Sequence, residues 1–253
     1  LEPLGADTAG SRYLDPDGSF PNHIPNPENE AAMQSILDAV QESKADLGII
    51  FDTDVDRAGA VLSDGTELNR NRIIAMMAAI LLREHPGTTI VTDSITSTGL
   101  AAFIRKHGGV HHRFKRGYRN VINESMRLNR EGHDSQLAME TSGHGALKEN
   151  YFLDDGAYLV TRLLIELARA KKEGYTLESL IADLAEPAES KEFRMNILVP
   201  DFKAYGQKII DELNVYAASQ PGWSVAPDNF EGVRVNLDKA HGDGWFLLRL
   251  SLH

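Results

Sequence analysis

The chain has 253 residues, of which 26 are Lys or Arg and 37 are Asp or Glu, so its formal net charge is -11. Its composition lies near the average of globular proteins, which excludes collagen-like, coiled-coil and wholly disordered classes and allows about one to three domains. A chain this acidic is a poor general ligand for polyanions, so we expect no nucleic-acid partner.

The chain contains no cysteine, which excludes disulfide scaffolds, thiolate zinc sites and cysteine nucleophiles and fits a reducing compartment. No apolar run approaches the ~18 residues that a membrane span needs. We therefore expect a cytoplasmic protein with no membrane partner. The chain begins at Leu1 without Met and ends in an apparent strand, residues 245–253, so we expect a fragment of a longer protein.

Apolar spacing along the first two thirds of the chain predicts an alternation of helices and strands. The expected helices are residues 29–41, 70–83, 97–106, 118–130 and 156–172, with Ser97 and Asp154-Asp155 as caps. The expected strands are residues 47–51, 89–92, 110–114 and 136–140. Strands separated by helices imply a largely parallel sheet.

The composition shifts near Glu186-Pro187, and a smaller α+β unit is expected beyond it. There we predict a strand over residues 193–199, a helix over 201–218, and a hairpin of strands 230–237 and 244–250. The expected fold class is therefore α/β, with mainly parallel mixed sheets, followed by a small α+β domain.

An acidic loop follows the first predicted strand directly, with Asp52, Asp54 and Asp56 at alternate positions and Arg57 after them. Three carboxylates this close repel one another, which raises their pKa values unless a cation neutralises them. Oxygen ligands suit a hard ion such as Mg²⁺ or Ca²⁺. The alternative is a solvated acidic loop in which Arg57 makes a surface ion pair.

Two known acidic motifs fit this loop less well. An EF-hand loop that starts at Asp52 needs Gly at its sixth position and Glu at its twelfth, where the chain has Arg57 and Ser63. The haloacid-dehalogenase phosphatases also place an Asp pair after a buried strand, but Asp56 stands where that motif has Thr or Val. The first interpretation is excluded, and the second is kept as an alternative.

A basic segment without any Asp or Glu runs from residue 94 to residue 123. Its densest part, residues 113–119, lies at a predicted strand-to-helix turn that includes Lys115. A helix N-terminus adds free N–H groups and the positive end of a dipole, so this turn is a natural phosphate site. The alternative is a solvated basic face.

The sequence Glu140-Thr141-Ser142-Gly143-His144 ends the next predicted strand. Ligands of open parallel sheets bind beyond the carboxyl ends of the strands, where this loop, the acidic loop and Lys115 are all expected. A carboxylate, a hydroxyl and an imidazole could hold sugar hydroxyls there and move protons. Taken alone, the segment also fits an ordinary turn.

Together these motifs resemble the α-D-phosphohexomutases, the phosphoglucomutase/phosphomannomutase family. Residues 52–57 are similar to the family's metal loop Asp-Gly-Asp-Gly-Asp-Arg, with both glycines replaced. Residues 139–144 are similar to its sugar loop Gly-Glu-x-Ser-Gly-His without the leading Gly. The segments 20–28, 148–149 and 154–156 and the Phe114-Lys115 pair also fit. Order and spacing agree along nearly the whole chain.

The resemblance implies a magnesium-dependent exchange between hexose 1-phosphate and hexose 6-phosphate, through a phosphoserine and a hexose bisphosphate intermediate. The Ser-Gly-His ending favours mannose or glucose as the hexose, and glucosamine remains an alternative. It also implies residue roles in this chain. The metal ligands would be Asp52, Asp54 and Asp56; the catalytic groups Arg57, Lys115 and His144; and the substrate ligands Lys115, Glu140, Ser142, His144, Arg249 and Ser251.

Two departures from the family shape the expected domain division. No phosphoserine loop of the Ser-His-Asn type occurs in the chain, so the serine domain is expected on the missing N-terminal part of the same protein. The family's last phosphate loop is Arg-x-Ser-Gly-Thr-Glu-Pro; Arg249-Leu250-Ser251 fits it, but Leu252-His253 replaces Gly-Thr. We expect residues 1–67 to be the end of domain 2, 68–187 domain 3, and 188–253 part of domain 4.

Two alternatives to a mutase fragment remain open from the sequence. One is a haloacid-dehalogenase-like phosphatase with Asp52 as its nucleophile, which would hydrolyse a phosphate ester without any other domain. The other is a catalytically silent module that binds sugar phosphates. A mutase fragment is expected to have no activity without the serine domain, whereas the phosphatase would be active as this chain alone.

Overall fold

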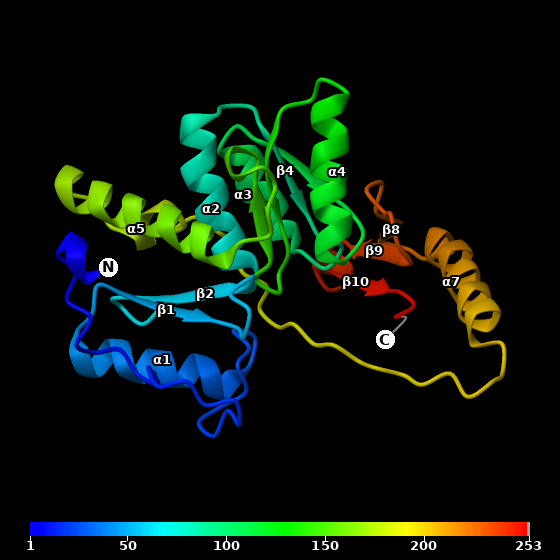
Figure 1. Cartoon of the computed structure of the whole chain (residues 1–253). Helices are drawn as coiled ribbons and strands as arrows, with labels where there is room; N and C mark the ends of the chain where they lie inside the picture. Colours follow the sequence, from blue (N-terminus) through cyan, green and yellow to red (C-terminus); the bar gives the residue numbers. More distant parts are fainter. Residues whose placement is uncertain (252–253) are drawn as a thin grey trace.

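The computed structural model describes residues 1–251, the side chain of Leu4 apart. Within these residues the strands form three separate sheets, each covered by helices (Figure 1). The α/β fold class is confirmed. Parallel pairing is confined to the middle sheet, and the first and last sheets are antiparallel throughout.

The first unit is a helix packed on a short antiparallel sheet. After the 3₁₀ turn η1 (Glu2–Leu4), helix α1 (Glu30–Ser43) begins at Asn29, whose side chain accepts a hydrogen bond from the backbone N–H of Ala32. The sheet consists of β1 (Leu47–Phe51), β2 (Ala58–Leu62) and β3 (Glu67–Leu68). The acidic loop thus connects the two strands of the β1–β2 hairpin. Strand β2, the partner of β1, was not predicted from the sequence.

The second unit is a four-stranded sheet in the order β5-β4-β6-β7. Its strands are β4 (Thr89–Thr92), β5 (Val110–Arg113), β6 (Ser135–Met139) and β7 (Gly145–Leu147). The first three are parallel, as predicted, and β7 returns antiparallel to β6. The carboxyl ends of β4, β5 and β6 therefore meet at one edge of the sheet.

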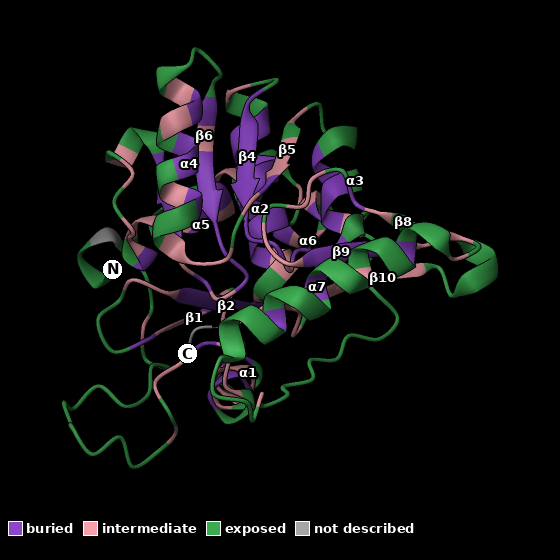
Figure 2. Cartoon of the chain, turned by 90° about the vertical axis from the view of Figure 1, so that its right-hand side faces the viewer, coloured by how far each residue is buried: buried purple, intermediate pink, exposed green. Residues whose placement is uncertain are grey.

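Helices cover both faces of this sheet. The main core joins buried side chains of α2 (Arg70–Glu84), α3 (Thr98–Lys106) and α5 (Gly156–Glu173) to β4 and β6. Helix α4 (Tyr118–Arg130) packs on the opposite face through Val121 and Leu128. Short turns η2 (Lys148–Asn150) and α6 (Leu177–Leu180) complete the unit. Strands β4 and β6 are buried throughout most of their length (Figure 2).

The predicted caps of two helices in this unit are confirmed. The Ser97 hydroxyl accepts a hydrogen bond from the backbone N–H of Leu100, and the Asp155 carboxylate accepts one from the backbone N–H of Tyr158. Each cap satisfies a donor that the first helical turn leaves free. The caps therefore fix where α3 and α5 begin.

The third unit consists of α7 (Phe202–Ser219), β8 (Trp223–Val225), β9 (Val233–Leu237), the 3₁₀ turn η3 (Lys239–His241) and β10 (Gly244–Leu248). The β9–β10 hairpin is confirmed. The strand predicted over residues 193–199 is wrong: this segment is an extended, largely exposed connection (Figure 1). Its apolar alternation is typical of a strand, but among the described residues no strand pairs with it.

The third unit docks beside the carboxyl ends of β4 and β5. The guanidinium of Arg234, which is fully buried on β9, donates to the carbonyl oxygen of Ser94 at 3.0 Å. The ring of Phe230 lies 5.0 Å from that of Phe114. The third unit is therefore in direct contact with the edge where ligands were expected. None of the described helices combines the length and apolarity that a membrane crossing needs.

Candidate functional site

The acidic loop is held in place by its own arginine. Asp52 is buried at the end of β1, and its Oδ2 accepts from Nε of Arg57 at 2.7 Å. Its Oδ1 accepts from the backbone N–H of Arg57 at 3.1 Å. Between them Val55 has φ 65°, a left-handed conformation that a β-branched residue rarely adopts. Both ends of this strained turn are therefore pinned.

The three carboxylates of this loop converge. Ligand oxygens of Asp52, Asp54 and Asp56 lie within 4.8 Å of one another. Burial raises the pKa of Asp52, but the hydrogen bonds and charge of Arg57 outweigh it and the net pKa is lowered. Burial, with the charges of Asp52 and Asp154, raises the pKa of Asp56 to about 6 despite the opposing charge of His144.

The donor set fits a hard divalent cation. All candidate ligands are carboxylate oxygens, which Mg²⁺ and Ca²⁺ prefer. Oδ1 of Asp56 is buried and has no hydrogen-bond partner within residues 1–251, and Nε of Arg57 lies 3.9 Å from it. Asp54 is exposed, so the group is open on one side. A cation bound at the open side of the group would give Oδ1 of Asp56 the partner that it lacks.

The predicted sugar loop connects β6 to β7. Glu140 is buried, its Oε1 accepts from the backbone N–H of Gly117 at 2.5 Å, and its Oε2 accepts from the Ser142 hydroxyl at 3.3 Å. Gly143 has φ 100°, and a Cβ there would lie 2.9 Å from the carbonyl oxygen of Ala58. Only glycine allows this close approach to the first unit.

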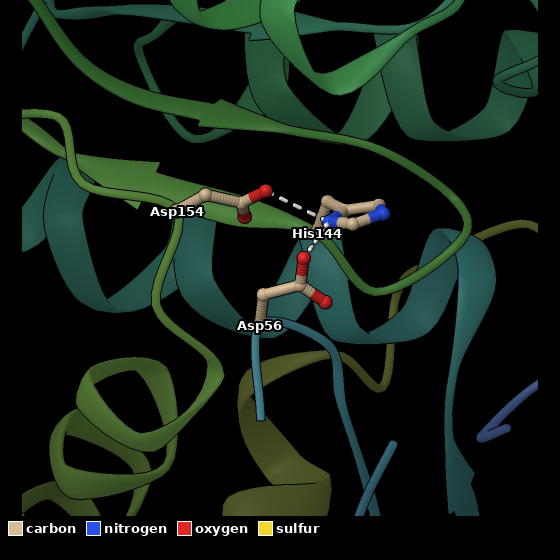
Figure 3. Close-up of side chains that lie close together, drawn as sticks. All are labelled: Asp56, His144 and Asp154. Atoms are coloured by element: carbon tan, nitrogen blue, oxygen red, sulfur yellow. Dashed lines mark hydrogen bonds and ion pairs between the residues drawn. The ribbon is translucent and has the colours of Figure 1, made fainter. Parts of the chain in front are cut away.

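His144 stands between two carboxylates from different units (Figure 3). Its Nδ1 lies 2.8 Å from Oδ2 of Asp154 and 3.6 Å from Oδ2 of Asp56. Burial alone would lower the pKa of His144, but the hydrogen bond and charge of Asp154, with the charges of Asp56 and Glu140, raise it. The backbones of Arg57 and His144 form a β-bridge, so the acidic loop and the sugar loop are neighbours.

The basic turn lies on the other side of the sugar loop. Lys115 is exposed and has no hydrogen bond or ion pair within the described residues. Gly117, the N-cap of α4, has no side chain that could cap the helix. Arg113, in contrast, is buried and paired with Asp228. Part of the basic segment is therefore interior structure, while Lys115 is exposed and unpaired among the described residues.

The last two predicted ligands belong to the third unit. Nε of Arg249 lies 3.6 Å from Oε1 of Glu231, and the side chain is partly exposed. Ser251 is exposed at the end of the described chain. The replacement Leu252-His253, which the sequence analysis singled out, lies outside the described residues. The acidic loop, the sugar loop and the Lys115 turn thus adjoin one another, and Arg249 approaches them through Glu231.

Three side chains at this edge were missed as site residues. Asp154, expected as a cap and within a family-like segment but not as a site residue, contacts His144, and the ring of Tyr118 stacks on His144 with centroids 4.9 Å apart. Asp93 is fully buried and accepts from the hydroxyl of Thr141 at 2.8 Å. Burial, and secondly the charge of Glu140, raise the pKa of Asp93 to about 7. Its position directly after a predicted strand, like that of Asp52, was the available signal.

Comparison with known proteins gives a consistent relationship. The family model "Phosphoglucomutase/phosphomannomutase, alpha/beta/alpha domain II" matches residues 3–65, and the model of alpha/beta/alpha domain III of the same family matches residues 69–187. The chain is 31% identical over 240 residues to phosphoglucomutase of Neisseria meningitidis, which is 94% of this chain and 48% of that protein. It is 33% identical over 254 residues to phosphomannomutase/phosphoglucomutase of Pseudomonas syringae, which is 99% of this chain and 50% of that protein.

A solved structure shows the same likeness in three dimensions. A phosphoglucomutase/phosphomannomutase family protein from Burkholderia thailandensis superposes with a TM-score of 0.75 at 31% identity, covering 94% of this chain and 46% of that one. The chain spans about half the length of the curated relatives that it matches.

Proposed function

Because the chain belongs to the phosphoglucomutase/phosphomannomutase family, we propose that it supplies the metal and sugar-phosphate sites of a phosphohexomutase. The reaction is the interconversion of hexose 1-phosphate and hexose 6-phosphate. The observation that supports this most strongly is the contact of two loops: the backbones of Arg57 and His144 form a β-bridge, and Asp56 and Asp154 flank the same imidazole. Metal ligands and sugar ligands thereby face one opening.

In this proposal Asp52, Asp54 and Asp56 hold Mg²⁺. A cation held there would supply charge neutralisation for the phosphate of a serine, which this proposal places in the parent protein outside residues 1–253. Arg57, already oriented by Asp52, adds a second positive charge beside it. Phosphoryl transfer depends mainly on positioning and charge neutralisation, which is what this group of side chains offers.

The substrate is proposed to lie against the carboxyl edge of the middle sheet. Glu140 and Ser142 bind sugar hydroxyls, and Lys115 binds the phosphate at the N-terminus of α4. His144 carries the proton of the reacting hydroxyl, with Nδ1 bonded to Asp154 and Nε2 left for the sugar. Arg249 and Ser251 contact the phosphate from the third unit. A hexose bisphosphate is the intermediate that turns over in this opening.

We also propose the division into residues 1–67, 68–187 and 188–253 as parts of the family's second, third and fourth domains. The three separate sheets support it: apart from Leu68, the last residue of β3, each sheet lies within one of these ranges. The serine domain would be a further part of the same protein. If this is so, residues 1–253 lack the phosphoryl carrier, and the chain alone should have no mutase activity.

The activity test uses the 253-residue chain with a hexose 1-phosphate, the matching hexose 1,6-bisphosphate and Mg²⁺. No mutase turnover is expected, because the phosphoryl carrier is missing. Release of inorganic phosphate would instead support a phosphatase, although both oxygens of Asp52 are already bonded by Arg57. The parent protein, assayed with mannose, glucose and glucosamine 1-phosphates, is expected to turn over at least one; failure with all three would indicate a silent binding module.

A further inference from the structure

A carboxylate of the third unit joins three groups that belong to different loops. Oε1 of Glu231 accepts from the Ser94 hydroxyl at 2.5 Å and lies 3.6 Å from Nε of Arg249. Its Oε2 accepts from the backbone N–H of Arg116 at 3.3 Å. Ser94 and Arg116 lie on the middle unit and Arg249 on the third. Glu231 therefore bridges the two units.

The groups that Glu231 contacts border the opening proposed for the sugar phosphate. Arg116 follows Lys115 in the turn at the N-terminus of α4, and Arg249 is the cation that the third unit brings to it. The side chain of Glu231 is 19% exposed and that of Arg249 23% exposed, so the pair is shielded but not closed off. An ion pair this sheltered is less weakened by solvent than a surface pair.

Only one side of the arginine is engaged by this contact. Glu231 faces Nε, and within residues 1–251 the terminal nitrogens Nη1 and Nη2 of Arg249 have no hydrogen-bond partner. A guanidinium binds phosphate best through two parallel N–H donors in a fixed plane. The contact is an ion pair without a hydrogen bond, centred on the nitrogen nearest the stem of the arginine, and Nη1 and Nη2 have no hydrogen-bond partner among the described residues.

Other contacts dock the same two units without touching a proposed phosphate ligand. Arg113 is paired with Asp228, and Arg234 donates to the carbonyl oxygen of Ser94 at 3.0 Å. Asp228 lies three positions before Glu231 in the same connection between β8 and β9. Docking and orientation of Arg249 can therefore be separated by mutation.

We propose that Glu231 is a positioning residue that fixes the guanidinium of Arg249 against the Lys115 turn when the third unit docks on the middle unit. Its carboxylate orients the arginine so that Nη1 and Nη2 are presented to the substrate phosphate. The inference rests on the proposed function, because it assigns the phosphate to Arg249. It adds a residue that acts on the phosphate only through that arginine.

The test measures binding of glucose 6-phosphate to the 253-residue chain by calorimetry. Glu231→Gln keeps the length of the side chain and one acceptor oxygen, so it can keep the bond from Ser94 or the bond from Arg116 but not both, and it removes the charge that orients Arg249. Freeing one rotamer-rich side chain costs about 0.5–1.5 kcal/mol, which is roughly two- to tenfold weaker binding. Asp228→Asn is the matched control, with binding expected within about twofold of the wild type.

A spectroscopic signal separates orientation from general stability. The Nε–H resonance of Arg249 should be a single, sharp peak in the wild type and in Asp228→Asn. In Glu231→Gln it should broaden or exchange rapidly with water. An unchanged Arg249 resonance in Glu231→Gln would overturn the proposal whatever the variant's affinity.

The remaining outcomes distinguish this inference from the proposed function. Arg249→Ala should weaken binding more than Glu231→Gln does; if it binds as the wild type does, or if the wild type binds no glucose 6-phosphate, the phosphate role of Arg249 and the inference both fail. If only Arg249→Ala weakens binding, the positioning role alone is wrong. Tighter binding by Glu231→Gln would show that the carboxylate competes with the phosphate for Arg249. An equal loss of affinity in Glu231→Gln and Asp228→Asn would show that Glu231 contributes only to docking of the two units. Either result contradicts the proposal.

Discussion

Gly156 donates its backbone N–H to the carbonyl oxygen of Val55 at 3.0 Å, which joins the N-terminus of α5 to the acidic loop of the first unit. A Cβ on Gly156 would lie 2.8 Å from that oxygen and 2.9 Å from the carbonyl carbon of Arg57. Both neighbours are backbone atoms of the loop proposed to hold the metal. The second unit therefore constrains the shape of the acidic loop from outside.

Gly156→Ala is expected to displace this loop and weaken Mg²⁺ binding, since backbone atoms cannot yield as a flexible side chain can. A clash of this kind costs about 1–3 kcal/mol of folding free energy. Denaturant unfolding and a Mn²⁺ titration measure the two effects. Gly18→Ala is the control, because a Cβ there meets nothing within 4 Å. Equal behaviour of the two variants would show that the contact does not constrain the loop.

Asp54→Asn should abolish binding of Mg²⁺ or Mn²⁺ measured by calorimetry. Asp54 is the exposed member of the three carboxylates, so its loss removes a ligand without disturbing the buried Asp52–Arg57 pair. The folding free energy should stay within about 0.5 kcal/mol of the wild type, as for most surface substitutions. Asp211→Asn, on the exposed face of α7, serves as a control for net charge. Metal binding that survives in Asp54→Asn would place the site elsewhere.

Lys115→Ala should weaken binding of a hexose phosphate by on the order of ten- to a hundredfold. A charge-assisted hydrogen bond contributes roughly 1.5–3 kcal/mol, at 1.4 kcal/mol per decade of affinity. The difference should shrink at high salt because the lysine is exposed. Lys172→Ala, also exposed, removes the same charge far along α5 and should bind as the wild type does. A loss in both variants would indicate general electrostatics.

Asp93→Asn should stabilise the protein progressively as the pH rises from about 4 to 7. The pKa of Asp93 is raised from 3.8 to about 7, so in this window the folded state keeps a proton that the unfolded state has lost. The ionisation of Asp93 therefore lowers the folding stability of the wild type as the pH rises. The uncharged amide that replaces it does not ionise, so Asp93→Asn keeps its stability over the same pH range. Urea unfolding at pH 5 and pH 8 checks the sign: the advantage of Asp93→Asn should be a few kcal/mol larger at pH 8. A pH-independent difference would mean that Asp93 does not titrate there.

Local patterns in the sequence predict much of this fold because the relevant signals are themselves local. Helix α4 occupies the predicted residues 118–130, and the Ser97 and Asp155 caps work as expected. Strand β2, in contrast, reads Ala58-Gly59-Ala60-Val61-Leu62, and its small residues carry no strand pattern until β1 pairs with it. The error over residues 193–199 is the reverse case: the apolar alternation is strong, but no strand lies beside it.

The residues of the candidate site also divide into those that a local sequence pattern predicts and those that only the folded structure brings together. The groups carried by recognisable loops, Asp52–Arg57 and Glu140–His144, could be predicted, and the structure places them side by side. Asp154 lies 10 positions beyond His144, and Glu231 lies 115 positions beyond Arg116, so no local spacing links these pairs. Contacts between units appear only when the chain is folded.

Hexose phosphate is proposed to bind where the acidic loop, the sugar loop and the Lys115 turn meet. The most direct test of this binding site is an amide NMR titration of the 253-residue chain with glucose 1,6-bisphosphate in the presence of Mg²⁺. We predict saturable shifts that are largest at Ser142, Gly143 and Lys115 and at the metal loop around Asp54. Shifts confined to other faces of the protein, or no saturable shifts at all, would contradict the account.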